Sequence, residues 1–97
     1  MSTKRKSGKK SNPEARRVVR RVQTGLRIER RLLKVMKGLA EYHDLSLGDL
    51  VEGIMLHVFE GKKPLGRKSL QVVQRLREVY GLDLVADDSH RLQESAR

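Results

Sequence analysis

The sequence contains no cysteine and no tryptophan, and its 97 residues include one phenylalanine and two tyrosines. The missing thiols exclude a disulfide framework, a thiolate zinc site and a cysteine nucleophile. So few aromatic rings are poorly suited to recognising single-stranded nucleic acid by base stacking. No apolar run approaches the roughly 18 residues that a membrane span needs. The charged start lacks the apolar stretch of a secretory signal, so we expect no such signal and no membrane partner.

Residues typical of catalysis are also scarce. The chain has no phosphate-binding loop, no pair of catalytic carboxylates and no Ser/His/Asp arrangement. Its three histidines, His43, His57 and His90, are far apart in the sequence, and His57 fits a packed position in a helix better than a metal site. We therefore expect no enzymatic activity, no cofactor and no bound metal.

Positive charge is the most prominent feature that is present. The 22 Lys and Arg residues exceed the 12 Asp and Glu residues, which gives a formal net charge of +10. Residues 1–37 hold 14 of the basic residues and only two acids, so the excess lies entirely in this part. A polarised basic charge favours nucleic acid as the partner, with an anionic membrane surface second. The alternative is a solvated basic tail without a specific partner.

A short strand is predicted after a basic N-terminal segment. Residues 1–19 have too little apolar surface to offset the entropy of ordering, and we expect them to form a disordered basic arm. Between Val22 and Ile28 apolar and polar residues alternate with period two, which is typical of a half-buried strand. No second strand pattern of this quality occurs in the chain. We therefore expect the strand to pair with the same strand of a second copy.

Two helices are predicted next, over 30–43 and 46–60. Apolar residues repeat with a period of 3.6 in the first, which ends near Asp44, a residue that tolerates the left-handed conformation. Ser46 and Asp49 resemble a capping box at the start of the second. The second helix is apolar around most of its circumference, more than one neighbouring helix can cover. A homodimer again supplies the missing surface.

The remainder of the chain predicts a third helix and a polar tail. Two glycines and a proline in residues 61–68 indicate a linker. A third amphipathic helix follows over 69–80, with Ser69 as its cap and Gly81-Leu82 as a Schellman stop. The fold class is therefore mainly α, with one short β-strand and a third C-terminal helix. The segments 62–82 and 83–97 are the linker with this helix and the polar C-terminal tail.

The order of strand, helix, capped turn and apolar helix resembles the ribbon-helix-helix family of DNA-binding proteins, of the Arc, MetJ and CopG type. The resemblance covers residues 22–61, and its most specific part is the stretch LSLGDLV, residues 45–51. It implies an intertwined homodimer whose strands form an intermolecular two-stranded antiparallel ribbon. In this interpretation residues 20–61 form the dimerisation and DNA-binding domain. The dimer interface implied comprises Val22, Thr24, Leu26, Ile28, Leu50, Val51, Ile54, Met55 and Val58.

The resemblance also implies which residues face double-stranded DNA. The ribbon enters the major groove, and the positions facing base edges are Gln23, Gly25 and Arg27. Arg27 suits guanine and Gln23 suits adenine, whereas Gly25 allows close approach of the backbone. The alternatives are an exposed polar strand face for Gln23 and Arg27, and a bulge for Gly25.

Phosphate contacts are expected from two places. Unpaired N–H groups at the start of the second helix can bind a phosphate, unless this is an ordinary capped helix. Arginines flanking the strand suit sequence-independent contacts. The predicted phosphate-binding residues are Arg16, Arg17, Arg20, Arg21, Arg30, Arg31, Ser46, Leu47 and Gly48.

These expectations lead to one main function and two alternatives. The main one is a dimeric, sequence-specific double-stranded DNA binder that acts as a transcriptional repressor in the prokaryotic cytoplasm, nucleoid-associated when bound. The first alternative is an antitoxin or plasmid-maintenance protein whose C-terminal helix docks a protein partner. The second is a non-specific nucleoid-type or RNA-binding protein.

Overall fold

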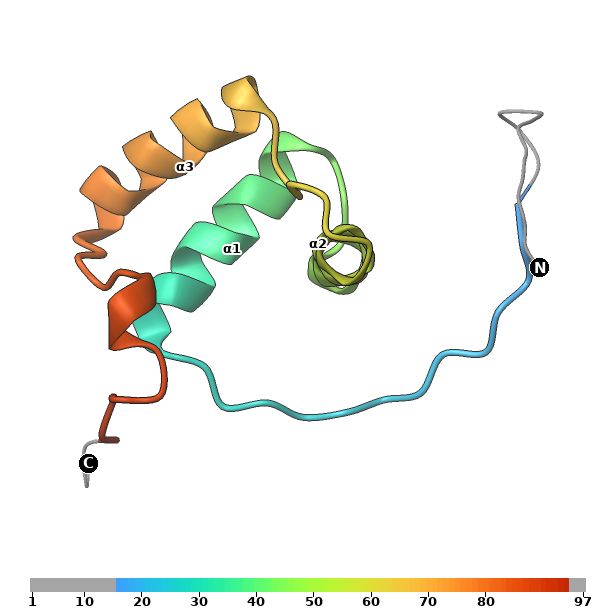
Figure 1. Ribbon diagram of the computed structural model, residues 1–97, viewed down its shortest axis with the longest axis horizontal. Helices are drawn as coiled ribbons and strands as arrows, with labels where there is room; N and C mark the ends of the chain where they lie inside the picture. The colour runs from blue at the N-terminus through green and yellow to red at the C-terminus, as the bar shows by residue number, and fades with distance from the viewer. Residues whose placement is uncertain (1–15, 95–97) are drawn as a thin grey trace.

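The computed structural model describes residues 16–94 and contains three α-helices and one 3-10 turn within them. In chain order these are α1 (Arg30–Tyr42), α2 (Leu47–Phe59), α3 (Arg67–Tyr80) and η2 (Ala86–Asp88). Figure 1 looks along α2, whereas α1 and α3 lie across the view. Residues 1–15 of the predicted disordered segment and residues 95–97 of the predicted tail lie outside the described residues.

The predicted β-strand is absent from residues 16–94, so the ribbon-helix-helix fold class is wrong for this structure. Residues 16–29, which we call the basic arm, are extended but form no strand pairing (Figure 1). The physical reason is that a single strand has no neighbour in the described part of its own chain to pair with. A strand is held by hydrogen bonds to a neighbour, and this chain has no second segment of matching pattern within reach.

Helix α1 is fixed at both ends by local contacts. At its start the Glu29 carboxylate accepts a hydrogen bond from the Leu32 N–H at 2.8 Å. At its end Asp44 adopts a left-handed conformation with φ 59°, as its position predicted. The Leu45 N–H then donates to the Ala40 carbonyl at 2.9 Å, which closes the turn as a glycine would. Val35, Leu39 and Ala40 are the buried residues of this helix.

The cap predicted for α2 is confirmed. The Ser46 hydroxyl accepts a hydrogen bond from the Asp49 N–H at 3.1 Å. The stop predicted for α3 is confirmed too, since Gly81 is left-handed with φ 65° and the Leu82 N–H donates to the Arg77 carbonyl at 2.9 Å. Leu82 folds back and is buried.

The cap predicted for α3 is wrong, because this helix begins at Arg67 and Gly66 occupies the cap position without a side-chain hydrogen bond. Ser69 is the third residue of the helix and is buried. Its hydroxyl is 2.8 Å from Nε2 of His43, the residue that follows α1. The serine therefore joins two helices instead of capping one.

The core lies where α1 meets the other two helices. Leu39, Ala40 and Leu50 form a buried cluster. The partly buried side chains around it are Ile54, Leu65, Val72, Val73 and Leu76. Three of these side chains, Val72, Val73 and Leu76, come from α3, so this helix packs on the fold and supplies much of the shell around the cluster.

Gly38 sets how closely α1 and α3 approach. A Cβ atom at this position would lie 2.7 Å from the Leu76 Cδ2 atom, inside van der Waals contact. At Gly53, in the middle of α2, an added Cβ would meet nothing within 4 Å. Both glycines thus lie inside a helix, but only Gly38 is in close contact with a neighbouring helix.

We expect Gly53→Ala to raise the free energy of unfolding by about 1 kcal/mol, the gain in helix propensity. The free energy of unfolding of the Gly38→Ala variant should be about 1–3 kcal/mol lower than that of the Gly53→Ala variant, because overpacking offsets the gain in helix propensity. Urea unfolding of both variants at one protein concentration measures the difference. Equal stabilisation by both substitutions would contradict the close approach of α1 and α3.

Candidate nucleic-acid interface

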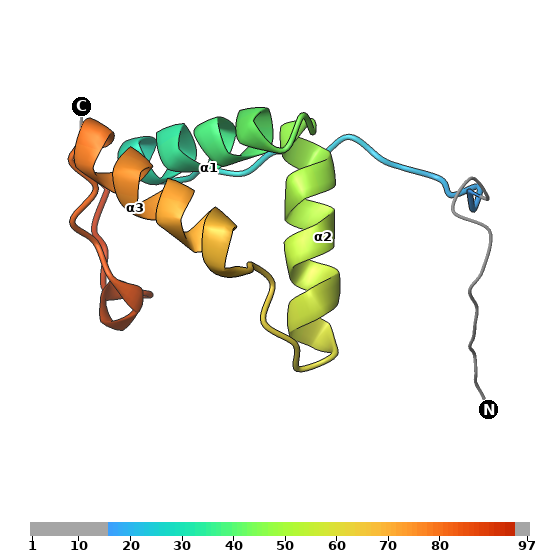
Figure 2. The ribbon, with the colours of Figure 1, turned by 90° about the horizontal axis from the view of Figure 1, so that it is seen from above.

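The basic arm exposes its side chains on every side. Arg16, Arg17 and Arg20 are exposed, and no ion pair involves them within residues 16–94. The arm leaves the start of α1 and runs past α2 (Figures 1 and 2). It therefore presents guanidinium groups from an extended backbone.

The alternation predicted along the arm does not separate a buried face from an open one. Gln23, Gly25 and Arg27, the predicted base-reading positions, are exposed. Their alternating neighbours are exposed as well, Val22 by 80% and Leu26 by 74%. Thr24 is exposed, and only Ile28 is half-buried. Within one chain, nothing in residues 16–94 covers the apolar side of the arm.

Arg21 is bound to two carboxylates of α2. Its Nε and Nη2 atoms donate to the two carboxylate oxygens of Glu52, each at 2.8 Å. Nη2 also donates to Oδ1 of Asp49 at 3.3 Å. The hydrogen bond and charge of Arg21 hold the pKa of Glu52 below its ordinary value, and Glu52 in turn raises the pKa of Arg21. The contact therefore joins the arm to the first two turns of α2.

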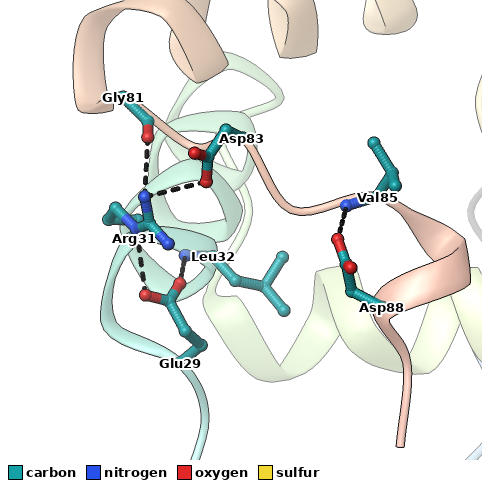
Figure 3. A network of polar contacts seen from close by, with 7 residues as sticks. All are labelled: Glu29, Arg31, Leu32, Gly81, Asp83, Val85 and Asp88. Carbon is teal, nitrogen blue, oxygen red and sulfur yellow. Dashed lines mark hydrogen bonds and ion pairs between the residues drawn. The ribbon is translucent and has the colours of Figure 1, made fainter. Parts of the chain in front are cut away.

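Two further arginines of the predicted DNA surface have carboxylate partners in the same chain. Arg27 forms an ion pair with Glu94, with its Nε donating to Oε1 at 3.1 Å. Arg31 donates from Nε to Glu29 at 3.0 Å, and from Nη1 to the Gly81 carbonyl at 2.9 Å and to Asp83 at 3.0 Å (Figure 3). The contacts of Arg31 join the start of α1 to the end of α3. Arg30, the adjacent residue, is exposed.

At the start of α2, the predicted phosphate-binding residues of the helix lie close to one of the predicted phosphate-binding arginines. Ser46 and Gly48 are exposed there and Leu47 is half-buried. Arg21 lies at Asp49 in the same turn. The sequence alone shows the acidic residues Asp49 and Glu52 three positions apart, but it does not show which arginine they bind. Glu94 was missed for the same reason, since it lies 67 residues from Arg27.

The predicted dimer residues on α2 divide into two groups. Leu50 is buried in the protomer and Ile54 packs against the same cluster, so both serve the fold. Val51 is half-buried, whereas Met55 and Val58 are exposed. Phe59, which the sequence reasoning did not assign to the interface, is 74% exposed. The open apolar side, which we call the α2 apolar face, comprises Val51, Met55, Val58 and Phe59.

Residues 16–94 contain neither a group of side chains suited to hold a metal ion nor a membrane-spanning helix. No group of three or more His, Asp or Glu side chains is placed to hold a metal ion within this range. None of the helices described is both long and apolar enough to cross a lipid bilayer.

The carboxyl group of Glu52 should titrate below its ordinary pKa of 4.5. Because the folded state lowers this pKa, the contact with Arg21 is complete above about pH 4.5 and breaks as the pH falls through the lowered value. Arg21→Gln should return the Glu52 midpoint towards its ordinary value, as followed by carboxyl NMR. Glu29 is the matched control, since its lowered pKa depends chiefly on the Leu32 N–H and should survive Arg21→Gln. An unchanged Glu52 midpoint in the variant would show that the ion pair does not form.

No family model matches the chain, and no curated protein or solved structure is significantly similar to it.

Proposed function

We propose that this protein binds double-stranded DNA through its basic arm. The observation that carries the proposal is the exposed, extended run with Arg16, Arg17 and Arg20, whose guanidinium groups have no carboxylate partner in residues 16–94. Guanidinium groups bind phosphate oxygens with charge-assisted, often bidentate hydrogen bonds. Neutralising phosphates releases counterions, which makes such binding favourable and dependent on salt.

An extended arm needs no β-ribbon to follow DNA. Basic arms of other DNA-binding folds lie along the backbone or in the minor groove as single extended segments. With every side chain from Arg16 to Arg27 exposed, the arm can turn its cations towards one duplex. Base reading by Gln23 and Arg27, and the repressor role that depends on it, stay predictions.

We further propose that the protein binds DNA as a homodimer formed through the α2 apolar face. The residues of this face are spaced 0, 4, 7 and 8 along the helix, so they line one side of it. In Figure 2, α1 and α3 lie on one side of α2, and no other described helix lies on the opposite side. A second copy is the occupant that fits, because the face carries no charge and a twofold axis brings two identical faces together without like-charge repulsion.

The DNA proposal predicts a specific salt dependence. The triple variant Arg16→Gln, Arg17→Gln, Arg20→Gln should bind a duplex of about 24 base pairs more weakly, with a salt slope reduced by about 0.9 for each phosphate that the arm no longer neutralises. Fluorescence anisotropy at several salt concentrations measures the affinity and the slope. Removing three cations outside the arm, with Lys63→Gln, Lys68→Gln and Arg75→Gln, is the control.

Equal reductions in affinity for the two triple variants would assign binding to net charge and not to the arm.

Comparing the affinity for a duplex chosen by selection with the affinity for a random duplex tests sequence specificity. Equal affinity for both, unchanged by Arg27→Ala, would favour the non-specific alternative.

The dimer proposal predicts that Met55→Glu with Phe59→Glu converts a dimer into a folded monomer, because both side chains are exposed in the protomer and lie on the α2 apolar face. Sedimentation velocity of the free protein measures the change. Leu70→Glu with Val79→Glu, two exposed apolar positions of α3, should leave the dimer intact. A wild-type monomer at micromolar concentrations would exclude this interface.

The alternative of a protein partner at the C-terminal helix cannot be tested by deleting that helix. Val72, Val73 and Leu76 of α3 pack against the core, so removing the helix would unfold the domain. Surface variants at Leu70 and Val79 keep the core and remove only exposed apolar area. They are therefore the suitable probes for such a partner.

A further inference from the structure

The basic arm is docked on its own chain by groups that resemble the proposed ligand. Arg21 meets Glu52 through two hydrogen bonds of 2.8 Å in a bidentate arrangement, and Asp49 through a third contact. A carboxylate presents two anionic oxygens to a guanidinium much as a phosphate does. The same arginine cannot make this arrangement with both at once. Bound DNA and α2 are thus exclusive partners of Arg21.

The docking contact is open to exchange. The Arg21 side chain is 62% exposed, and those of Asp49 and Glu52 are about half exposed. Exposed ion pairs of this kind contribute little free energy, because water and salt screen them. A contact of that strength holds the arm in the free protein and yields to a polyanion.

A third carboxylate also binds the arm. Glu94, from the segment that follows η2, pairs with Arg27 farther along the arm. The arm is therefore held at two positions by two segments remote from it in sequence. In contrast, Arg16, Arg17 and Arg20 make no ion pair within the described residues and stay available for a first encounter with DNA.

We propose that Asp49 and Glu52 of α2 form an autoinhibitory contact that holds Arg21 of the basic arm and that DNA phosphates must displace. This inference rests on the proposed DNA binding. Displacement exchanges one set of charge-assisted hydrogen bonds for another, and it leaves two carboxylates beside the phosphate backbone. Both effects lower the affinity of the native protein for DNA.

If the same contact had the opposite role, removing Glu52 would change the affinity for DNA in the opposite direction. If Glu52 served to orient the arm for DNA, its removal would weaken binding, although it removes a negative charge. If Glu52 competes with DNA, its removal strengthens binding. The sign of the change therefore distinguishes competition from positioning.

The test uses the full chain with Glu52→Gln, which keeps the shape of the side chain and removes its charge. We expect binding of the same duplex at low salt to become about 2- to 5-fold tighter than wild type, the range that an exposed ion pair can account for. The matched control is Glu78→Gln in α3, an exposed glutamate with no ion pair in residues 16–94. It makes the same change in net charge and should tighten binding less.

A second readout follows the arm directly. In the free protein, backbone ¹⁵N relaxation should show residues 18–24 becoming more mobile in Glu52→Gln and unchanged in Glu78→Gln. Equal tightening by the two variants, or weaker binding by Glu52→Gln, would overturn the autoinhibitory contact while leaving DNA binding in place. Failure of the wild-type protein to bind any duplex would instead overturn the proposed function, and this inference with it.

Discussion

The packing of α1 against α3 is the contact on which the rest of this structure depends. Gly38 lets Leu76 approach the α1 backbone, and Leu39 and Ala40 on the same helix complete the buried cluster with Leu50 of α2. In a chain without cysteine, this small apolar cluster has to hold three helices together. The hydrogen bond between His43 and Ser69 and the contacts of Arg31 then fix the two ends of the same helix pair.

The same packing determines what is left for other molecules. Because α3 packs against α1 and Leu50 is the one buried residue of α2, most of the apolar surface of α2 stays open. The arm is left with no sheet to join, so its cations and its valines are both exposed. An uncharged helix face and a cationic extended segment call for different partners. This is why the proposed dimerisation and the proposed DNA binding involve separate parts of the chain.

Local patterns in the sequence predicted most of the helices and their ends. The Ser46 cap, the left-handed Asp44 and the Gly81-Leu82 stop each depend on residues within one turn, and all three are present. The predicted strand failed because its hydrogen-bond partner was not local, and alternation alone cannot form a strand. Ser69 was misplaced because its partner, His43, lies at the end of another helix. Spacing could not reveal the partners of Arg21 and Arg27 for the same reason.

The distribution of charge gives the proposed autoinhibitory contact its physical sense. The first 37 residues carry a large positive excess, whereas α2 holds Asp49 and Glu52 and no Lys or Arg, so attraction between the arm and α2 is built into the sequence. In the proposed exchange DNA replaces a carboxylate at Arg21, so counterions leave the phosphates, while cations also return to the freed carboxylates. The salt dependence of binding should then be shallower than the number of arginines in the arm suggests. A shallow slope with a fully basic arm is therefore the expected signature of a protein whose own acids compete with its ligand.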